Sequence, residues 1–153
     1  MYRKAGTKKW NYAWTDGATE YYLKNLKKGG LYEFMFAAYK KNSENEWERG
    51  AYSKTSFRYY YKEKIKKVKA GKKSVTVKWT KDKNSIGYEL FYATNPEMTN
   101  RKKIVINNKN TTSYTIKKLK KGKKYYIRVR SIKKLKNRRY TGEFSSQKKI
   151  KAK

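Results

Sequence analysis

The chain has 153 residues, with 43 Lys and Arg against 11 Asp and Glu, which gives a formal net charge of +32. It contains no His and no Cys, so it lacks a histidine general base, a thiolate nucleophile, a disulfide and any His- or Cys-ligated metal site. Its 16 Tyr, 5 Phe and 4 Trp favour a folded chain over a disordered one, because each aromatic side chain buries a large area.

The acidic residues are scattered, and their one cluster lies in residues 44–48, which are predicted to form a loop. Enzymes without His, Cys or paired carboxylates are rare, so we predict a non-enzymatic protein with no cofactor and no metal. The longest apolar run, residues 34–39, has six residues. A membrane-spanning helix needs about 20, so no membrane insertion is expected. Met1 is followed by YRKAGTKKW, which is not a signal peptide.

In chain order, four stretches alternate between apolar and polar residues: 32–36, 75–79, 88–92 and 125–130. Alternation with a period of two predicts strands with one buried face. Turn residues (Gly, Asn, Asp and Lys) separate the stretches, which is typical of an antiparallel β-sandwich. In this scheme Phe36 faces inward, whereas Phe91 and Tyr126 face outward.

One pattern occurs twice in the chain. Residues 26–39, LKKGGLYEFMFAAY, match residues 119–132, LKKGKKYYIRVRSI, at an offset of 93. The same offset extends upstream to residues 19–23, whereas residues 49–53 match the residues 92 positions later. Because loops tolerate insertions and strand registers do not, the one-residue difference predicts a hairpin loop between the matched parts. A period of this length indicates tandem domains, since solenoid repeats are much shorter.

The second half of the chain resembles a fibronectin type III domain of the Lys-rich kind found in repeats of Gram-positive cell-surface and secreted proteins. The matching segments are VTVKW at 75–79 for strand B, YELFYAT at 88–94 for strand C, TSYTIKKL at 112–119 for strand E, GKKYYIRVRSI at 122–132 for strand F and SSQKKIKA at 145–152 for strand G. The spacing Leu119-x-x-Gly122-x-x-Tyr125 matches the family's turn into strand F, although Lys121 stands where the family often has Pro.

The resemblance implies an all-β fold of antiparallel immunoglobulin-like sandwiches in tandem. It also implies a tyrosine corner, in which the Tyr ring packs inward and its hydroxyl bonds nearby backbone. The expected core and corner residues are Trp79, Tyr88, Leu119, Gly122, Tyr125 and, in the first copy, Tyr32.

We predict an incomplete domain over residues 1–62, from the end of strand C to strand G, and a complete domain over residues 63–153. YRKAGTKKW resembles the end of strand C, so that Tyr2 corresponds to about Tyr92 and strands A and B are missing. Two explanations stay open. The favoured one is truncation of the sequence, and the other is completion of the half-domain by strands from another chain.

Charge is concentrated in the second domain. Residues 1–62 hold 13 basic and 6 acidic residues, whereas residues 63–153 hold 30 basic and 5 acidic residues, a net charge of +25. These charges have two possible interpretations. They form an ordinary solvated surface, or they form a surface that binds polyanions, with stacking contacts from Phe91 and Tyr126. The candidate binding residues are Lys120, Lys121, Lys123, Lys124, Arg128, Arg130, Lys133, Lys134, Arg138 and Arg139.

The resemblance implies a non-catalytic spacer and binding module, outside the cell or on its surface, beside other domains of a longer parent protein. Anionic wall polymers such as teichoic acids are the expected ligand, and carbohydrate stacking on Trp47 is a further option. For Trp47 the favoured interpretation is instead a loop side chain folded back on Tyr52 or the sheet. The alternative function is a basic nucleic-acid-associated protein inside the cell, since any chain this basic binds nucleic acid non-specifically.

Overall fold

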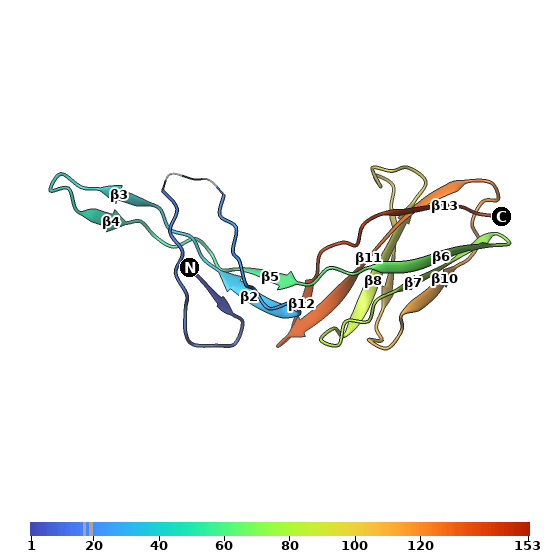
Figure 1. Cartoon of the computed structure of the whole chain (residues 1–153), viewed down its shortest axis with the longest axis horizontal. Helices are drawn as coiled ribbons and strands as arrows, with labels where there is room; N and C mark the ends of the chain where they lie inside the picture. Colours follow the sequence, from blue (N-terminus) through green and yellow to red (C-terminus); the bar gives the residue numbers. More distant parts are fainter. Residues whose placement is uncertain (17, 19) are drawn as a thin grey trace. The chain divides into compact units, whose positions relative to one another are not determined.

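The computed structural model describes residues 1–16, 18 and 20–153 of the chain (Figure 1). Thr19, the first residue of the upstream repeat match, lies outside the described residues. The chain divides into two compact units, unit 1 from Met1 to Tyr60 and unit 2 from Tyr61 to Lys153. Every regular element in the described part of the chain is a β-strand, and no helix there is long and apolar enough to cross a membrane.

Unit 2 is an antiparallel sandwich of two sheets, which confirms the predicted fold class. One sheet has the order β10-β7-β6, and the other has the order β12-β11-β8-β9, with β13 also paired to β11. The strands are β6 (Ile65–Gly71), β7 (Ser74–Trp79), β8 (Gly87–Ala93), β9 (Lys102–Ile106), β10 (Ser113–Ile116), β11 (Lys124–Leu135), β12 (Arg138–Thr141) and β13 (Lys148–Lys151).

The space between the two sheets is filled by the side chains that alternate inward along the strands. Trp79 and Tyr88 pack edge to face with ring centroids 5.4 Å apart. Both rings are buried, which removes a large apolar area from water. The core consists of Ile65, Val75, Val77, Trp79, Tyr88, Leu90, Ile106, Ile116, Leu119, Tyr125, Ile127, Val129 and Ala152.

A second, smaller cluster covers the outer face of the β11–β8 sheet. Between β12 and β13 the chain leaves the sheet edge, and Phe144 packs edge to face on Phe91 at 5.1 Å. Ala93 and Met98 complete the buried part, and Tyr126 packs against it. The expectation of an exposed outward Phe91 is therefore wrong: it does point away from the main core, but the loops beyond the sheet bury it.

Unit 1 contains a three-stranded antiparallel sheet with the order β1-β2-β5 and a separate hairpin of β3 and β4. The strands are β1 (Tyr2–Lys4), β2 (Gly30–Phe34), β3 (Tyr39–Lys41), β4 (Trp47–Arg49) and β5 (Ser56–Tyr60). Leu31, Tyr32 and Tyr59 are the buried apolar residues of its sheet.

The strand registers of unit 1 reproduce those of unit 2. The matched pairs are Tyr2↔Phe34 with Tyr92↔Ile127, Tyr32↔Arg58 with Tyr125↔Ile150, and Tyr39↔Arg49 with Ile132↔Thr141. The one-residue change in the repeat falls in the turn between β3 and β4, where the corresponding turn between β11 and β12 is shorter. The predicted hairpin loop at this place is confirmed.

One strand prediction fails in unit 1. Residues 32–36 were expected to form a strand with Phe36 facing inward, but β2 ends at Phe34, and Phe36 is 64% exposed. The matching residue in unit 2, Val129, is fully buried. The physical reason is that β7 and its sheet lie over Val129, whereas no second sheet in the described part of unit 1 lies over Phe36.

Candidate polyanion-binding surface

The turn between β10 and β11 exposes five lysines, Lys117, Lys118, Lys120, Lys121 and Lys123, and Lys124 follows as the exposed first residue of β11. Gly122 has a φ of +77° and Lys118 a φ of +58°, so both adopt the left-handed backbone conformation found in tight turns. Gly122 suits its position because glycine adopts this conformation at little cost. Leu119 is buried in the core, and the Tyr125 hydroxyl accepts a hydrogen bond from the Lys120 amide at 2.9 Å. These anchors fix the backbone and leave the lysine side chains between them exposed.

Backbone hydrogen bonds join this turn to two segments that are distant in sequence. The Leu119 amide donates to the Lys73 carbonyl, and the Gly122 amide donates to the Ala152 carbonyl, both at 2.9 Å. The Lys73 amide in turn donates to the Lys153 carbonyl at 2.6 Å. The β6–β7 turn, the β10–β11 turn and the end of the chain therefore lie side by side at one end of the sandwich (Figure 1).

We call this end of unit 2 the lysine pole. It is formed by Lys72, Lys73, Lys117, Lys118, Lys120, Lys121, Lys123, Lys124, Lys151 and Lys153. All ten side chains are exposed, and the three segments that carry them contain no Asp or Glu. Among the described residues, no ion pair involves any of the ten. The pole is therefore a dense positive surface without internal counter-charge.

Of the five acidic side chains of unit 2, Glu63, Asp82 and Glu89 are buried, whereas Glu97 and Glu143 are exposed. None of the five lies in the three segments of the pole. Glu63 and Asp82 are buried away from the pole, where Glu63 accepts a hydrogen bond from Thr80 at 2.8 Å. Near them, burial raises the pKa of Tyr61 to about 12, and the charges of Glu63 and Asp82 add to the effect. No group of three or more acidic side chains suited to a metal ion occurs in the part of the chain described.

Glu89 is also buried, and it is bound by the outer-face arginine Arg130. Their side chains form an ion pair at 2.7 Å, and Lys103 lies 3.6 Å from the same carboxylate. The Arg130 guanidinium lies 4.5 Å from the Phe144 ring centroid and 5.3 Å from that of Phe91. The expected contact between Arg130 and the ring of Phe91 is present, but Arg130 also holds the carboxylate of Glu89, and Phe91 is buried and not exposed as expected.

The remaining candidates lie elsewhere along β11. Arg128 is half-buried on the outer face, between the positions of Tyr126 and Arg130. Lys133 and Lys134, together with Arg138 and Arg139, belong to the hairpin of β11 and β12. β11 has 12 residues, so this hairpin lies roughly 35 Å from the pole at the usual rise per residue.

Of the ten residues predicted from sequence, the structure brings two separate groups together. Lys120, Lys121, Lys123 and Lys124 lie at the pole, and Lys133, Lys134, Arg138 and Arg139 lie on the β11–β12 hairpin. The six other lysines of the pole were not among the predicted site residues. Lys117 and Lys118 adjoin the predicted group in sequence, whereas Lys72, Lys73, Lys151 and Lys153 are distant from it in sequence. Their proximity depends on the backbone bonds that close this end of the sandwich.

Trp47 in unit 1 does not fold back on Tyr52 as expected. It is 65% exposed at the start of β4, and the Lys41 ammonium lies 5.6 Å from its ring centroid. The ring of Tyr52 instead lies 4.1 Å from the guanidinium of Arg49. The arrangement leaves most of the indole face in solvent, and the carbohydrate contact stays a prediction.

Comparisons with known proteins identify the family to which unit 2 is similar. The family model described as fibronectin type III domain matches residues 64–147. A Kelch domain-containing protein of Sulfurisphaera tokodaii is 43% identical over 68 residues, which are 44% of this chain and 9% of that protein's length. The chain thus spans a small part of this relative.

Two solved structures are similar to the chain, and only the first described here supports the fold, and the fold alone. The crystal structure of chicken CNTN1 FN1–FN3 domains covers 99% of this chain and 53% of its own length, with a TM-score of 0.50 and 18% identity. A structure described as a myokine covers 56% of this chain and 89% of its own length, with a TM-score of 0.46 and 20% identity.

Proposed function

Because the chain belongs to the fibronectin type III family, whose domain spans residues 64–147, we propose that it is a binding and spacing module of a longer secreted or surface-exposed protein. The fibronectin type III domain is a non-catalytic module, and the roles left for it are to position neighbouring domains and to bind a partner. The small share of the Kelch domain-containing relative that the chain matches supports the idea of a part of a larger protein.

The partner that we propose is a linear anionic polymer, and the lysine pole is the single observation that carries this proposal. Ten exposed ammonium groups on three joined segments face solvent, with no Asp or Glu side chain in those segments. A polymer that neutralises them releases its own condensed counterions, which favours binding at low salt. A turn-rich end of a sandwich also leaves its side chains free to adapt to a flexible chain.

The composition of the pole favours charge recognition over sequence recognition. Lys presents an ammonium as a point charge, whereas Arg presents a planar fork that matches one phosphate or one base edge. All ten basic residues of the pole are Lys. We therefore expect similar affinity for phosphate polymers and for sulfated or carboxylated polymers of equal charge density. Among these, teichoic acid is the polymer that we propose as the partner.

The test is a salt titration of binding to purified teichoic acid, with heparin and duplex DNA as parallel ligands. Engaging four to six charges should weaken binding by at least ~100-fold between 50 and 200 mM salt. The variant in which Lys120, Lys121, Lys123 and Lys124 are replaced by Glu should lose most affinity for every polymer and keep its fold. All four side chains are exposed.

The matched control changes the same number of charges elsewhere in unit 2. Lys66, Lys83, Lys102 and Lys109 are all exposed and lie outside the pole. Their replacement by Glu lowers the net charge equally and should cost much less affinity. Equal losses of affinity in the two variants would mean that binding depends on the total surface charge and not on the pole. Salt-insensitive binding, or strong preference for one DNA sequence, would contradict the proposal and favour nucleic-acid recognition instead.

A further inference from the structure

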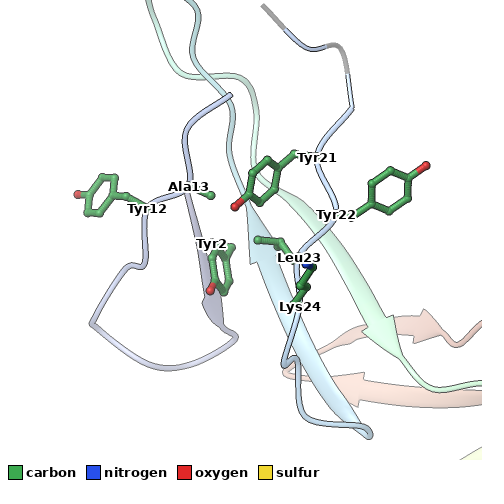
Figure 2. A pocket seen from close by; sticks show the side chains of 7 residues that line it. All are labelled: Tyr2, Tyr12, Ala13, Tyr21, Tyr22, Leu23 and Lys24. Atoms are coloured by element: carbon green, nitrogen blue, oxygen red, sulfur yellow. The ribbon is translucent and has the colours of Figure 1, made fainter. Parts of the chain in front are cut away.

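A hollow in unit 1 has the wrong lining for an anionic polymer. Lys24 is the one charged side chain among its described lining residues (Figure 2). The others are Tyr2, Tyr12, Ala13, Tyr21, Tyr22 and Leu23. A further basic surface, distinct from the lysine pole but next to it, lies instead on unit 2.

This surface is the outer face of the smaller sheet of unit 2, which has the order β10-β7-β6. Val75, Val77 and Trp79 of β7 are buried in the core, so the alternation of the strand directs Thr76 and Lys78 away from it. The strand registers identify the neighbours of these two residues on the same face. One row across the sheet is Ser113–Lys78–Lys67, and the next is Thr115–Thr76–Lys69.

We call these six residues the lysine face. Its three lysines are exposed, and among the described residues none of the three belongs to an ion pair. β6, β7 and β10 contain no Asp or Glu. Lys66 falls in the irregularity between Ile65 and Lys67 and has no partner in the register with β7, so it is not counted in the face. The strands of the lysine face therefore carry positive charge and no carboxylate.

Lys67 and Lys78 lie directly opposite each other on neighbouring strands. The Cβ atoms of such a pair are about 5 Å apart, and like charges in this position destabilise a sheet. Lysine on an edge strand discourages pairing with other chains, which accounts for Lys67 on β6. It does not account for Lys78, because β7 is the central strand of this sheet. An anion bound between the two ammonium groups removes their repulsion.

Hydroxyl groups lie beside the lysines on the same face. The Thr76 and Thr115 hydroxyls are 2.9 Å apart and share one hydrogen bond. Whichever hydroxyl donates this bond, the other keeps its own hydrogen, which is a donor for an anionic oxygen. The lysine face therefore combines ammonium groups with a neutral donor, and both suit the oxygens of a phosphate group.

The lysine face is continuous with the lysine pole. Thr115 of β10 points outward, and the same alternation brings Lys117 of the pole to this side. On the opposite edge of the sheet, β6 leads from Lys69 toward the turn that carries Lys73 of the pole. From Lys67 to Lys73 the strand and its turn extend roughly 20 Å at the usual rise per residue.

We propose that a linear phosphate polymer bound at the lysine pole continues along the lysine face, with a phosphate group between Lys67 and Lys78. This inference rests on the proposed function and extends it to a preference for polymer length. A polymer much shorter than ~20 Å reaches the pole alone, whereas a longer one reaches both surfaces. The second set of contacts forms within the same complex, so it raises affinity at high effective concentration.

The probe is inorganic polyphosphate, separated into fractions with contour lengths well below and well above ~20 Å. It is titrated into the full chain at about 0.1 M salt, where the Debye length of about 10 Å screens the face from an oligomer at the pole. In the face variant Lys67, Lys69 and Lys78 are replaced by Thr, which suits outward strand positions. Its affinity for the long fraction should fall at least tenfold, and its affinity for the short fraction should stay within twofold of the wild type.

The matched control replaces Lys83, Lys102 and Lys109 by Thr. All three are exposed and lie outside both the face and the pole, so this variant loses the same number of charges. Its affinity for either fraction should change less than threefold. Circular dichroism of the two variants should match that of the wild type, since outward side chains are changed and the core is kept.

The repulsion between Lys67 and Lys78 has a readout without polymer. Lys78→Thr should raise the unfolding temperature of unit 2 by about 1–5 °C at low salt, because Lys67 then loses its like-charged neighbour. The gain should shrink at high salt, where the repulsion is screened. Lys102→Thr, on β9 of the other sheet, controls for the higher strand preference of Thr and should give a smaller gain.

Three results would overturn the proposal: equal losses of affinity in the face variant and its control, equal losses for the short and long fractions, or no gain in unfolding temperature from Lys78→Thr over Lys102→Thr. In each case the wild type still binds polyphosphate through the pole, and the proposed function stands. If the wild type binds neither fraction, the proposed function fails and this inference fails with it.

Discussion

The hydroxyl of Tyr125 accepts a hydrogen bond from the backbone amide of Lys120 at 2.9 Å, across the turn that enters β11. The repeat contains the same bond a second time, because the Tyr32 hydroxyl accepts from the Lys27 amide at 2.7 Å. Each tyrosine ring is buried while its hydroxyl holds the preceding turn. In unit 2 this bond fixes the turn that carries five lysines of the pole.

Tyr125→Phe should lower the free energy of unfolding of unit 2 by roughly 1 kcal/mol or somewhat more, since the ring stays and the Lys120 amide loses its acceptor. Tyr126→Phe should be nearly silent, because the Tyr126 ring lies on the other face of the strand and packs against the smaller cluster. Urea denaturation of both variants measures the difference. Equal losses would contradict the role assigned to the Tyr125 hydroxyl.

Trp79→Ala should cost about 3–5 kcal/mol, as aromatic truncations in protein cores do. Trp79 is 2% exposed and stacks on Tyr88, so its removal leaves a cavity between the two sheets. Trp47→Ala is the matched control in unit 1, where the indole is mostly in solvent and its loss should be nearly neutral. Thermal unfolding followed by circular dichroism would show the contrast, and a small effect at Trp79 would mean that the core is packed differently.

Arg130→Met should destabilise unit 2 by about 1.5–3 kcal/mol, because the buried carboxylate of Glu89 then loses its closest charged partner. Polymer binding should stay within twofold of the wild type, since Arg130 is held by Glu89 and the aromatic cluster and does not reach the pole. Chemical denaturation and a binding titration on the same sample separate the two effects. A large loss of affinity for the polymer without loss of stability would mean that Arg130 contacts the polymer.

Tyr61→Phe should reduce the loss of stability at high pH. The folded-state pKa of Tyr61 is raised from 10.0 to about 12, chiefly by burial and then by Glu63 and Asp82. The folded state therefore holds its proton more tightly than the unfolded state does, and stability is lost as pH rises from about 10 to 12. Denaturation curves at several pH values in this window, for wild type and variant, isolate the contribution. Parallel pH dependence in the two proteins would contradict it.

Much of the fold can be predicted from local patterns in the sequence. The alternation at residues 75–79 and 125–130 gives strands with one buried face wherever a second sheet is present. The repeat offset of 93, changing to 92, places the single insertion in a hairpin turn because strand registers cannot absorb it. The spacing of Leu119, Gly122 and Tyr125 identifies the turn into β11. Leu119 is buried, Gly122 has a positive φ, and the Tyr125 hydroxyl accepts a hydrogen bond from the turn. These features depend on neighbours in sequence or in one strand pair.

Other features depend on contacts that the sequence does not encode locally. Phe91 alternates outward from the core, but a loop and the segment between β12 and β13 bury it, and they bring Glu89, Arg130 and Phe144 together. Phe36 has the pattern of a core residue, yet it is exposed because no second sheet in the described part of unit 1 covers it.

The lysine pole shows the same division most clearly. Composition alone established that unit 2 is strongly basic, because net charge is independent of fold. Which lysines act together was decided by the tertiary structure. Backbone bonds from Leu119 to Lys73 and from Gly122 to Ala152 join three turns and ends into one surface, while the β11–β12 hairpin carries its own basic residues to the opposite end.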